Sequence, residues 1–325
     1  MKGRYTFHDY QPRELSLQDA VVEGFTGAPK SIPPKFFYDV RGSELFDAIC
    51  RQPEYYLPRI ETRMLETLAE EIAELTGPGR VVIEPGAGSA AKIRLLLEAL
   101  RPSAYVPLDI SCEYVKSAAH DLVQDYPWLP VHAACVDYTH SLPIPDPTPD
   151  SRRLLFFPGS SLGNFEPDQA EAFLRLCSNT AGEDGMLLIG VDTKKAPIIL
   201  HAAYNDAAGV TAAFNLNLLH RIRRELNVDL VPEKFEHLAF YNAPDGRIEM
   251  HLVSRSHQQV RIDGQVFDFT SGETVHTECS YKYSPGEFLA MATHAGFECC
   301  AHWLGEDDLF ALYLLRNAGW IEDES

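Results

Sequence analysis

The sequence has no long hydrophobic run and no cluster of basic residues among its 325 positions. A helix needs about 20 consecutive apolar residues to cross a bilayer, and residues 1–12 have no apolar stretch typical of a signal peptide. A cytoplasmic location is therefore expected. Lys and Arg total 28 against 47 Asp and Glu, a formal net charge of −19. Because proteins that bind phosphate groups do so with clustered Lys and Arg, we expect no nucleic-acid partner and no membrane partner.

Metal-binding signatures are also missing. The chain has no CxxC pair, no Cys/His spacing that suits zinc and no HExxH segment, so no metal is expected. The seven cysteines are scattered and odd in number, which favours reduced thiols, mostly buried. They are Cys50, Cys112, Cys135, Cys177, Cys279, Cys299 and Cys300.

Strands and helices alternate through the middle of the chain, after a Pro-rich and aromatic-rich start with expected helices over 43–50 and 61–75. Apolar runs predict strands over 81–84, 105–109, 130–134, 154–157 and 186–191. Helical periodicity between them predicts helices over 90–100, 113–125 and 167–179. This alternation is typical of right-handed βαβ units, so an α/β fold with a doubly wound parallel sheet is expected.

The pattern changes beyond residue 195. A largely helical stretch over 207–226 precedes strand-like segments over 247–255, 258–262 and 274–283, and residues 297–315 resemble two strands around the turn 305–308. We expect two domains. The core comprises residues 60–195 and 284–325, and a smaller α+β substrate-binding lobe comprises residues 1–59 and 196–283.

A glycine turn follows the strand over 81–84, with the sequence EPGAGS at 84–89. Gly86 and Gly88 permit a close approach of a ligand to the backbone before the next helix. Asp109 ends the following strand, 25 positions after Glu84, where a carboxylate can accept both hydroxyls of a ribose. Asp137 and Tyr138 end the third strand, where they could hold an adenine. A nucleoside cofactor site is therefore predicted.

Two cofactors compete for this site. The spacing of Gly86, Gly88 and Ala91 also fits a dinucleotide fingerprint, which would indicate a nicotinamide-dependent dehydrogenase. Glu84, however, would repel a pyrophosphate and attract the ammonium group of a methionine. About eighty residues precede the turn, and no residue is evident as a hydride-transfer acid. S-adenosylmethionine, with S-adenosylhomocysteine as its product, is the favoured ligand.

Further segments in order along the chain resemble the histidine-specific Nα-methyltransferases of ergothioneine biosynthesis, which convert histidine to hercynine. The segments are 33–39 (PPKFFYD), 42–46 (GSELF), 53–56 (PEYY), 159–164 (GSSLGN), 203–215 (AYNDAAGVTAAFN), 235–237 (FEH), 248–250 (IEM) and 277–280 (TECS). The resemblance implies a class I methyltransferase (Rossmann-like) core and methylation of the α-amino group of free histidine.

The resemblance also implies roles for individual residues. The cofactor would be contacted by Gly86, Lys92, Asp109, Asp137 and Tyr138, in addition to Glu84 and Gly88 of the turn. The amino and carboxylate head of histidine would be held by Tyr55, Asn164 and Tyr204. Glu278 and Ser280 would bind the imidazole nitrogens, with Met250 nearby and Tyr38 and Phe46 as walls of the pocket.

The spacing of the late segment is compatible with the roles that the resemblance implies, although taken by itself a Glu-x-Ser on a strand is more often a solvated face. Glu278 and Ser280 are two positions apart on a strand, so their side chains share a face, while Cys279 points the other way. A site that pairs both ring nitrogens rejects analogues that lack them. The alternatives are methylation of another amino acid or small amine, and a binding module without turnover. A monomer is expected.

Overall fold

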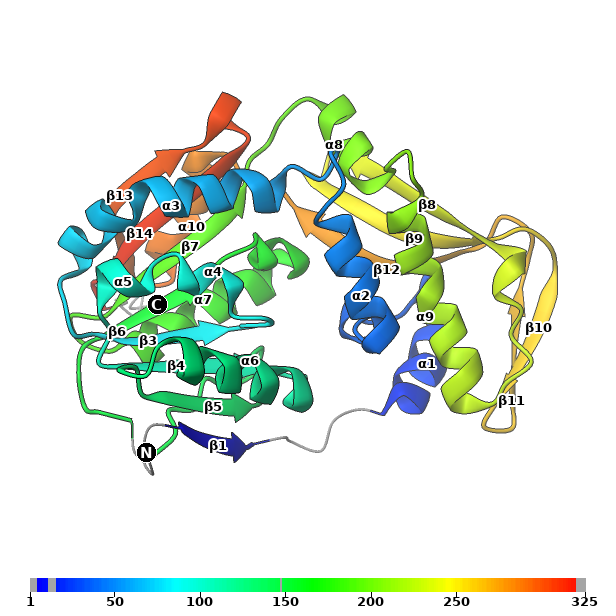
Figure 1. Ribbon diagram of the computed structural model, residues 1–325. Coiled ribbons are helices and arrows are strands. Elements are labelled where there is room, and N and C mark those ends of the chain that lie inside the picture. Colours follow the sequence, from blue (N-terminus) through cyan, green and yellow to red (C-terminus); the bar gives the residue numbers. More distant parts are fainter. Residues whose placement is uncertain (1–4, 11–15, 147, 320–325) are drawn as a thin grey trace, which may run out of the picture. The chain divides into compact units, whose positions relative to one another are not determined.

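The chain divides into two units, each built around its own β-sheet (Figure 1). The computed structural model describes residues 5–10, 16–146 and 148–319. Within them, unit 1 comprises residues 5–10, 59–193 and 283–319, and unit 2 comprises residues 16–58 and 194–282. In this described part, no helix has both the length and the apolar character needed to span a membrane.

Unit 1 contains an eight-stranded sheet in the order β1-β5-β4-β3-β6-β7-β14-β13. All five strands expected between residues 81 and 191 are present, and their mutual pairings are parallel. Two antiparallel strands, β14 beside β7 and β13 beside β14, complete one side. The strands are β3 (Val81–Pro85), β4 (Ala104–Asp109), β5 (Val131–Cys135), β6 (Arg153–Phe157), β7 (Met186–Asp192), β13 (Phe297–Leu304) and β14 (Phe310–Asn317).

The N-terminal strand β1 (Tyr5–Asp9) pairs in parallel with β5. The expectation that all of residues 1–59 belong to the second lobe is therefore wrong for this strand. Its side chains are half-buried or exposed, because it lies at the edge of the sheet, and its sequence lacks the apolar run that marks the central strands.

Helices flank the sheet of unit 1 on both faces, as expected for a doubly wound fold (Figure 1). They are α3 (Leu57–Thr76), α4 (Ala91–Arg94), α5 (Leu97–Leu100), α6 (Cys112–Asp125), α7 (Pro167–Ala181) and α10 (Pro285–His294). The single helix expected over 90–100 is wrong, since it divides into α4 and α5. The N–H groups of Leu95 and Leu96 bond three residues back, a tighter turn that leaves Leu96 and Leu97 both fully buried.

Unit 2 contains a four-stranded sheet in the order β2-β12-β9-β8 and a hairpin of β10 and β11. Helices α8 and α9 pack on β8, and α9 also contacts β9 and α2. The helix expected over 207–226 begins at Val210, because Gly209 adopts a left-handed conformation immediately before it. The elements are α1 (Leu17–Thr26), β2 (Lys30–Ser31), η1 (Pro34–Phe37), α2 (Val40–Ile49), α8 (Pro197–Tyr204), α9 (Val210–Leu226), β8 (Phe235–Asn242), β9 (Arg247–Ser254), β10 (Gln258–Ile262), β11 (Gln265–Phe269) and β12 (Thr274–Tyr281).

Candidate functional site

The carboxyl ends of four parallel strands carry the candidate residues of unit 1. The strand order changes direction between β3 and β6, and ligands of open α/β sheets bind at such a switch point. The glycine turn follows β3, Asp109 ends β4, Asp137 and Tyr138 follow β5, and Asn164 follows β6. The structure therefore brings these residues to one edge of the sheet.

The glycine turn is held against the ends of β4 and β5. Gly86 has a φ of +67°, and a Cβ atom there would lie 3.1 Å from the hydroxyl oxygen of Tyr138. Gly88 donates its N–H to Asp109 Oδ2 at 2.9 Å, and Ser111 donates to Oδ1 at 2.9 Å. Burial raises the pKa of Asp109, against the lowering effect of these bonds. Each carboxylate oxygen still has a lone pair with which to accept a ligand hydroxyl.

Glu84 places a buried carboxyl group directly before this turn. Tyr105 donates its hydroxyl to Glu84 Oε2 at 2.6 Å. Burial raises the pKa of Glu84 to about 8, although the Tyr105 bond and the nearby Lys92 lower it. An ionised carboxylate is therefore costly here, and a cationic ligand group would stabilise it.

Lys92, on α4, forms an ion pair with a residue that the sequence analysis missed. Its Nζ lies 2.5 Å from Glu61 Oε2, and the Glu61 side chain is fully buried. Glu61 also accepts the N–H of Gly159, at 2.8 and 3.1 Å from its two oxygens. Glu61 thus links α3, α4 and the loop after β6. Its sequence signal is its phase: it shares the apolar stripe of α3 with Leu65 and Ile72.

The Asp137 carboxylate, directly after β5, is held by hydrogen bonds from its own segment. Asp137 Oδ1 accepts the N–H of Thr139 at 3.1 Å and the Thr139 hydroxyl at 2.5 Å. The Tyr138 ring packs edge-on against Phe157 and Phe173. Burial raises the pKa of Tyr138, and the charges of Asp109 and Asp137 raise it further. The charges of Asp109 and Asp137 therefore both act on the Tyr138 hydroxyl at this edge of the sheet.

Asn164 ends the short helix η2 (Ser161–Asn164) and is half-buried. Ser160 precedes η2 with a φ of +59°, and its hydroxyl accepts the N–H of Asp192 at 2.8 Å. This bond ties the loop after β6 to the end of β7, which fixes the backbone that carries Asn164.

In unit 2, a β-bulge sets the direction of the candidate substrate residues. The β12–β9 register shifts between His276 and Glu278. After the shift, Glu278 lies opposite Met250 and Ser280 lies opposite Ile248. The hydroxyl of Thr277, inside the bulge, donates to the side-chain oxygen of Asn215 at 2.8 Å and approaches Met250 O at 3.0 Å. The expected common face of Glu278 and Ser280 is therefore present on β12.

Ser280 is held by two neighbours. Tyr204 Oη donates to Ser280 Oγ at 2.9 Å, and Lys282 Nζ donates to the same oxygen at 2.8 Å. Lys282 also lies 3.2 Å from Tyr204 Oη and is fully buried. Lys282 is not among the residues expected from the sequence, although it continues the two-residue spacing of Glu278 and Ser280. A hydroxyl oxygen accepts at most two such bonds, so the hydrogen of Ser280 remains to be donated.

Tyr55 lies close enough to Tyr204, Glu278 and Tyr38 for each to raise its pKa. Burial raises the pKa of Glu278 to about 7, while the charge of Lys282 lowers it. Burial also raises the pKa of Tyr55 well above its usual value, and the Tyr55 ring stands edge-on to Tyr204 at 6.1 Å. The two residues expected as walls of the pocket contact each other, with Tyr38 and Phe46 ring centroids 5.7 Å apart.

The opposite face of the unit 2 sheet carries a charged cluster. Cys279 lies opposite Glu249, as the alternation along β12 predicts. Glu249, His251 and His276 offer ligand atoms within 4.8 Å of one another, while Arg247 Nε lies 2.9 Å from Glu249 Oε1. The expectation that the protein binds no metal stays a prediction.

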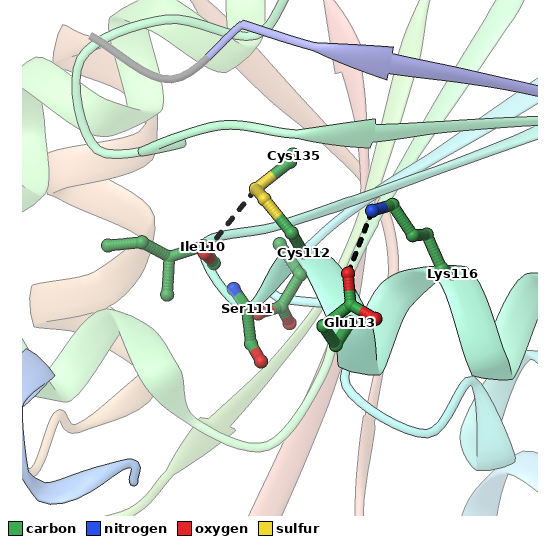
Figure 2. Close-up of a disulfide and its surroundings, with 7 residues drawn as sticks. Ile110, Ser111, Cys112, Glu113, Lys116 and Cys135 are labelled. Atoms are coloured by element: carbon green, nitrogen blue, oxygen red, sulfur yellow. Dashed lines mark hydrogen bonds and ion pairs between the residues drawn. A yellow bond between two sulfur atoms is a disulfide. The ribbon is translucent and has the colours of Figure 1, made fainter.

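The expectation of reduced thiols is wrong for two cysteines. Cys112 and Cys135 form a disulfide (Figure 2). They are 23 positions apart, so no short motif marks the pair; the fold brings the start of α6 to the end of β5. The adjacent Cys299 and Cys300 are exposed rather than buried.

Comparisons with known proteins identify the family of the chain. A family model described as "Histidine-specific methyltransferase, SAM-dependent" matches residues 17–317. The histidine N-alpha-methyltransferase of Mycolicibacterium smegmatis is 40% identical over 307 residues, which cover 92% of this chain and 94% of the relative. The protein of the same name from Mycobacterium tuberculosis is 37% identical, with the same coverage.

A more distant relative is the 4-dimethylallyltryptophan N-methyltransferase of Claviceps purpurea. It is 28% identical over 334 residues, which cover 94% of this chain and 96% of the relative. The match of the family model over most of the chain, together with the two relatives above 30% identity, shows the family. The chain is a methyltransferase that belongs to the histidine-specific, S-adenosylmethionine-dependent family.

Proposed function

We propose that this enzyme transfers methyl groups from S-adenosylmethionine to the α-amino nitrogen of free L-histidine and forms Nα,Nα,Nα-trimethylhistidine, hercynine, for ergothioneine biosynthesis. The observation that carries the proposal is the pair of Glu278 and Ser280 on one face of β12. This pair offers one acceptor and one donor at neighbouring positions.

The pair fits the two nitrogens of a neutral imidazole. A neutral imidazole has one N–H donor and one acceptor nitrogen. The Ser280 hydroxyl has its acceptor positions filled by Tyr204 and Lys282, so it donates to the acceptor nitrogen. The Glu278 carboxylate accepts the N–H. An indole carries one N–H and no acceptor nitrogen, and it would leave the Ser280 hydroxyl unpaired.

The remaining contacts of histidine are assigned to groups at its other end and around its ring. We assign the amino and carboxylate head to Tyr55, Asn164 and Tyr204. Because its pKa is raised by burial, Tyr55 stays protonated and acts as a hydrogen-bond donor rather than a base. Met250, Tyr38 and Phe46 are assigned to the walls around the ring.

The residues of unit 1 fit S-adenosylmethionine by the chemistry of their side chains. Glu84 suits the methionine ammonium, because its buried carboxyl group gains from a nearby cation. Asp109 suits the ribose hydroxyls, and Asp137 with Tyr138 suits the adenine. Gly86, Gly88 and Lys92 complete the assigned set. A dinucleotide would bring its pyrophosphate against Glu84, so the turn does not suit the nicotinamide cofactor that the glycine spacing also allowed.

The chemistry asks for alignment more than for acid–base catalysis. The sulfonium of the donor supplies an already activated methyl group. The protein's residues hold an unprotonated amine in line with it and exclude water. The amine loses its proton to water before it attacks the methyl group, so the protein needs no strong base.

Turnover with free histidine tests the proposal. The protein is incubated with S-adenosylmethionine and, in parallel, with histidine, tryptophan, 4-dimethylallyltryptophan or other small amines. Hercynine, identified by mass spectrometry, is expected from histidine alone. Methylation of another amine in preference to histidine would replace the proposed substrate. A folded protein that binds S-adenosylhomocysteine but methylates none of these amines would contradict the proposed substrate class.

We propose a cytoplasmic monomer with a small-molecule substrate and no nucleic-acid or membrane partner. The net charge of −19 opposes binding to polyanions. Size-exclusion chromatography with light scattering tests the monomer, since a mass of twice 36.4 kDa would contradict it.

A further inference from the structure

The Cys112–Cys135 disulfide joins the two segments of unit 1 that carry Asp109 and Asp137. Cys112 is the first residue of α6, three positions after Asp109. Cys135 is the last residue of β5, two positions before Asp137. Figure 2 shows the bridge beside the backbone of Ile110 and Ser111. The bridge therefore closes directly behind two carboxylates of the candidate cofactor site.

The backbone around the bridge transmits its constraint to Asp109. Asp109 is the direct register partner of Cys135 on the neighbouring strand. The carbonyl of Asp109 accepts the N–H of Val136 at 2.9 Å, and its side chain accepts the N–H of Ser111. If the bridge opens, the loop between β4 and α6 loses its covalent tie to β5, and the Asp109 and Asp137 side chains gain freedom relative to each other.

We propose that Cys112 and Cys135 form a reversible thiol–disulfide modification site that sets the affinity for the adenosyl cofactor, with tighter binding in the oxidised state. The proposal rests on the assignment of Asp109 and Asp137 to ribose and adenine in the proposed function. It does not depend on which amine is methylated.

The two cysteines differ in exposure, which suits a pair in which one thiol reacts with peroxide and the other then forms the disulfide. Cys112 is half-buried, so a small oxidant in the solvent reaches it more readily than a fully buried thiol. Cys135 is fully buried. The Cys112 thiolate attacks hydrogen peroxide and becomes a sulfenic acid, with release of hydroxide. The Cys135 thiol then displaces the sulfenic oxygen as water and forms the disulfide.

Reduction reverses the bridge with two electrons and two protons. The thiolate of a dithiol reductant attacks one sulfur and forms a mixed disulfide, and its second thiol closes to the oxidised reductant and releases both cysteine thiols. Asp9 offers a carboxylate oxygen within 4.8 Å of the two sulfur atoms. Because this trio could hold a divalent cation once reduced, the reduced protein is studied with a chelator present.

The test compares the full-length protein in two redox states. Protein reduced with dithiothreitol, and the same protein reoxidised with equimolar hydrogen peroxide, are titrated with S-adenosylhomocysteine by calorimetry. Peptide mapping after alkylation reports which cysteines are bridged. We expect the reduced state to bind about fivefold more weakly, the scale set by immobilising one or two further side chains on binding.

Variants locate the effect. Cys112→Ser should bind S-adenosylhomocysteine as weakly as the reduced wild type, whether it is treated with dithiothreitol or with peroxide. Cys135→Ser removes the buried partner and should behave in the same way. The matched control is Cys299→Ser/Cys300→Ser, which removes the exposed adjacent thiols and should keep the redox response. Equal affinities in the two wild-type states, a response that survives in Cys112→Ser, or peroxide treatment that leaves Cys112 and Cys135 unbridged would each overturn the proposal.

If S-adenosylhomocysteine binds with the expected redox response but histidine is not methylated, only the substrate assignment is wrong. If histidine is methylated but affinity ignores the redox state, only the inference about the disulfide is wrong.

Discussion

Glu278 is the residue on which the choice of substrate depends most directly. Its replacement by Gln keeps the shape but exchanges a carboxylate for a weaker acceptor. A buried hydrogen bond to a charged group contributes about 1.5–3 kcal/mol, so Glu278→Gln should raise the KM for histidine at least tenfold. The Kd for S-adenosylhomocysteine should stay within twofold. Glu236→Gln, at an exposed position of β8, is the control, and equal losses of both ligands in Glu278→Gln would contradict the assigned role.

The same carboxyl group predicts a pH dependence. Burial raises the pKa of Glu278 to about 7, so it is ionised above that pH and protonated below it. Only the ionised form is a full acceptor for an imidazole N–H. Free imidazole also protonates near pH 6.5 and then lacks the acceptor nitrogen that Ser280 needs. The KM for histidine should therefore rise as the pH falls from 8 to 6.

Steady-state kinetics across that range checks this expectation. In Glu278→Gln the rise should be smaller, because only the substrate then titrates. Identical pH profiles for the wild type and the variant would show that Glu278 does not contribute.

Glu84 should act on stability and on binding in opposite directions. Its folded-state pKa, about 8, is raised by burial. Folding therefore favours the neutral carboxyl of Glu84. Its contribution to the free energy of unfolding is fully present below the unfolded pKa of about 4.3 and is lost as the pH rises through 8. Glu84→Gln should raise the melting temperature of the ligand-free protein at pH 8 but not at pH 5. It should also weaken S-adenosylhomocysteine at least tenfold, because the ligand ammonium loses its carboxylate.

Thermal melts at both pH values, with and without ligand, check this pair of effects. A variant that is less stable at pH 8, or that binds the ligand as tightly as the wild type, would contradict the role of Glu84.

Glu84, Asp109, Glu278 and Ser280 were predictable from the sequence, but buried partners such as Glu61 and Lys282 were not. Glu61 contacts Lys92 and Gly159 across three elements, and no local pattern encodes such a contact. Its position on an apolar helical stripe indicates only that it is buried. Partners of this kind depend on tertiary packing, which a single sequence does not display.

At the scale of elements, the bulge in β12 determines what Glu278 can face. Without it, the strict alternation from His276 would place Glu278 on the same face as His251, away from Met250. The expected common face of Glu278 and Ser280 followed from alternation alone. The bulge decides which face of the sheet these two side chains occupy. The sequence of β12 contains no glycine or other signal that predicts a bulge.

Thr277 should hold this bulge in place. Its hydroxyl and the Asn215 side chain form a fully buried bond, and Thr277→Val leaves the Asn215 oxygen unpaired at a cost of about 1–3 kcal/mol. We expect a lower melting temperature and a raised KM for histidine, with the Kd for S-adenosylhomocysteine unchanged. Thr274→Val, at a half-buried position of the same strand, is the matched control. An unchanged KM for histidine in Thr277→Val would show that this bond to the bulge does not influence substrate binding.

At the scale of the whole molecule, the central parallel strands were predictable because each is a short apolar run that is buried on both faces. The order of the two antiparallel strands at one side of the sheet was not predictable. A hairpin over 297–315 can join β7 by either strand, and the structure pairs β14, the later one, with it. The edge strand β1 was missed for the related reason that half-exposed strands lack a distinctive pattern.

The cofactor should stabilise the folded chain, and a dinucleotide should not. A ligand that binds only the folded state adds RT ln(1 + [L]/Kd), about 2.7 kcal/mol at a hundredfold excess over Kd. S-adenosylhomocysteine should therefore raise the melting temperature by several degrees, and NAD at the same concentration should not, since its pyrophosphate would meet Glu84. Because the chain has two units, the melt is followed by calorimetry, which resolves separate transitions. Stabilisation by NAD as large as that by S-adenosylhomocysteine would contradict the role assigned to Glu84.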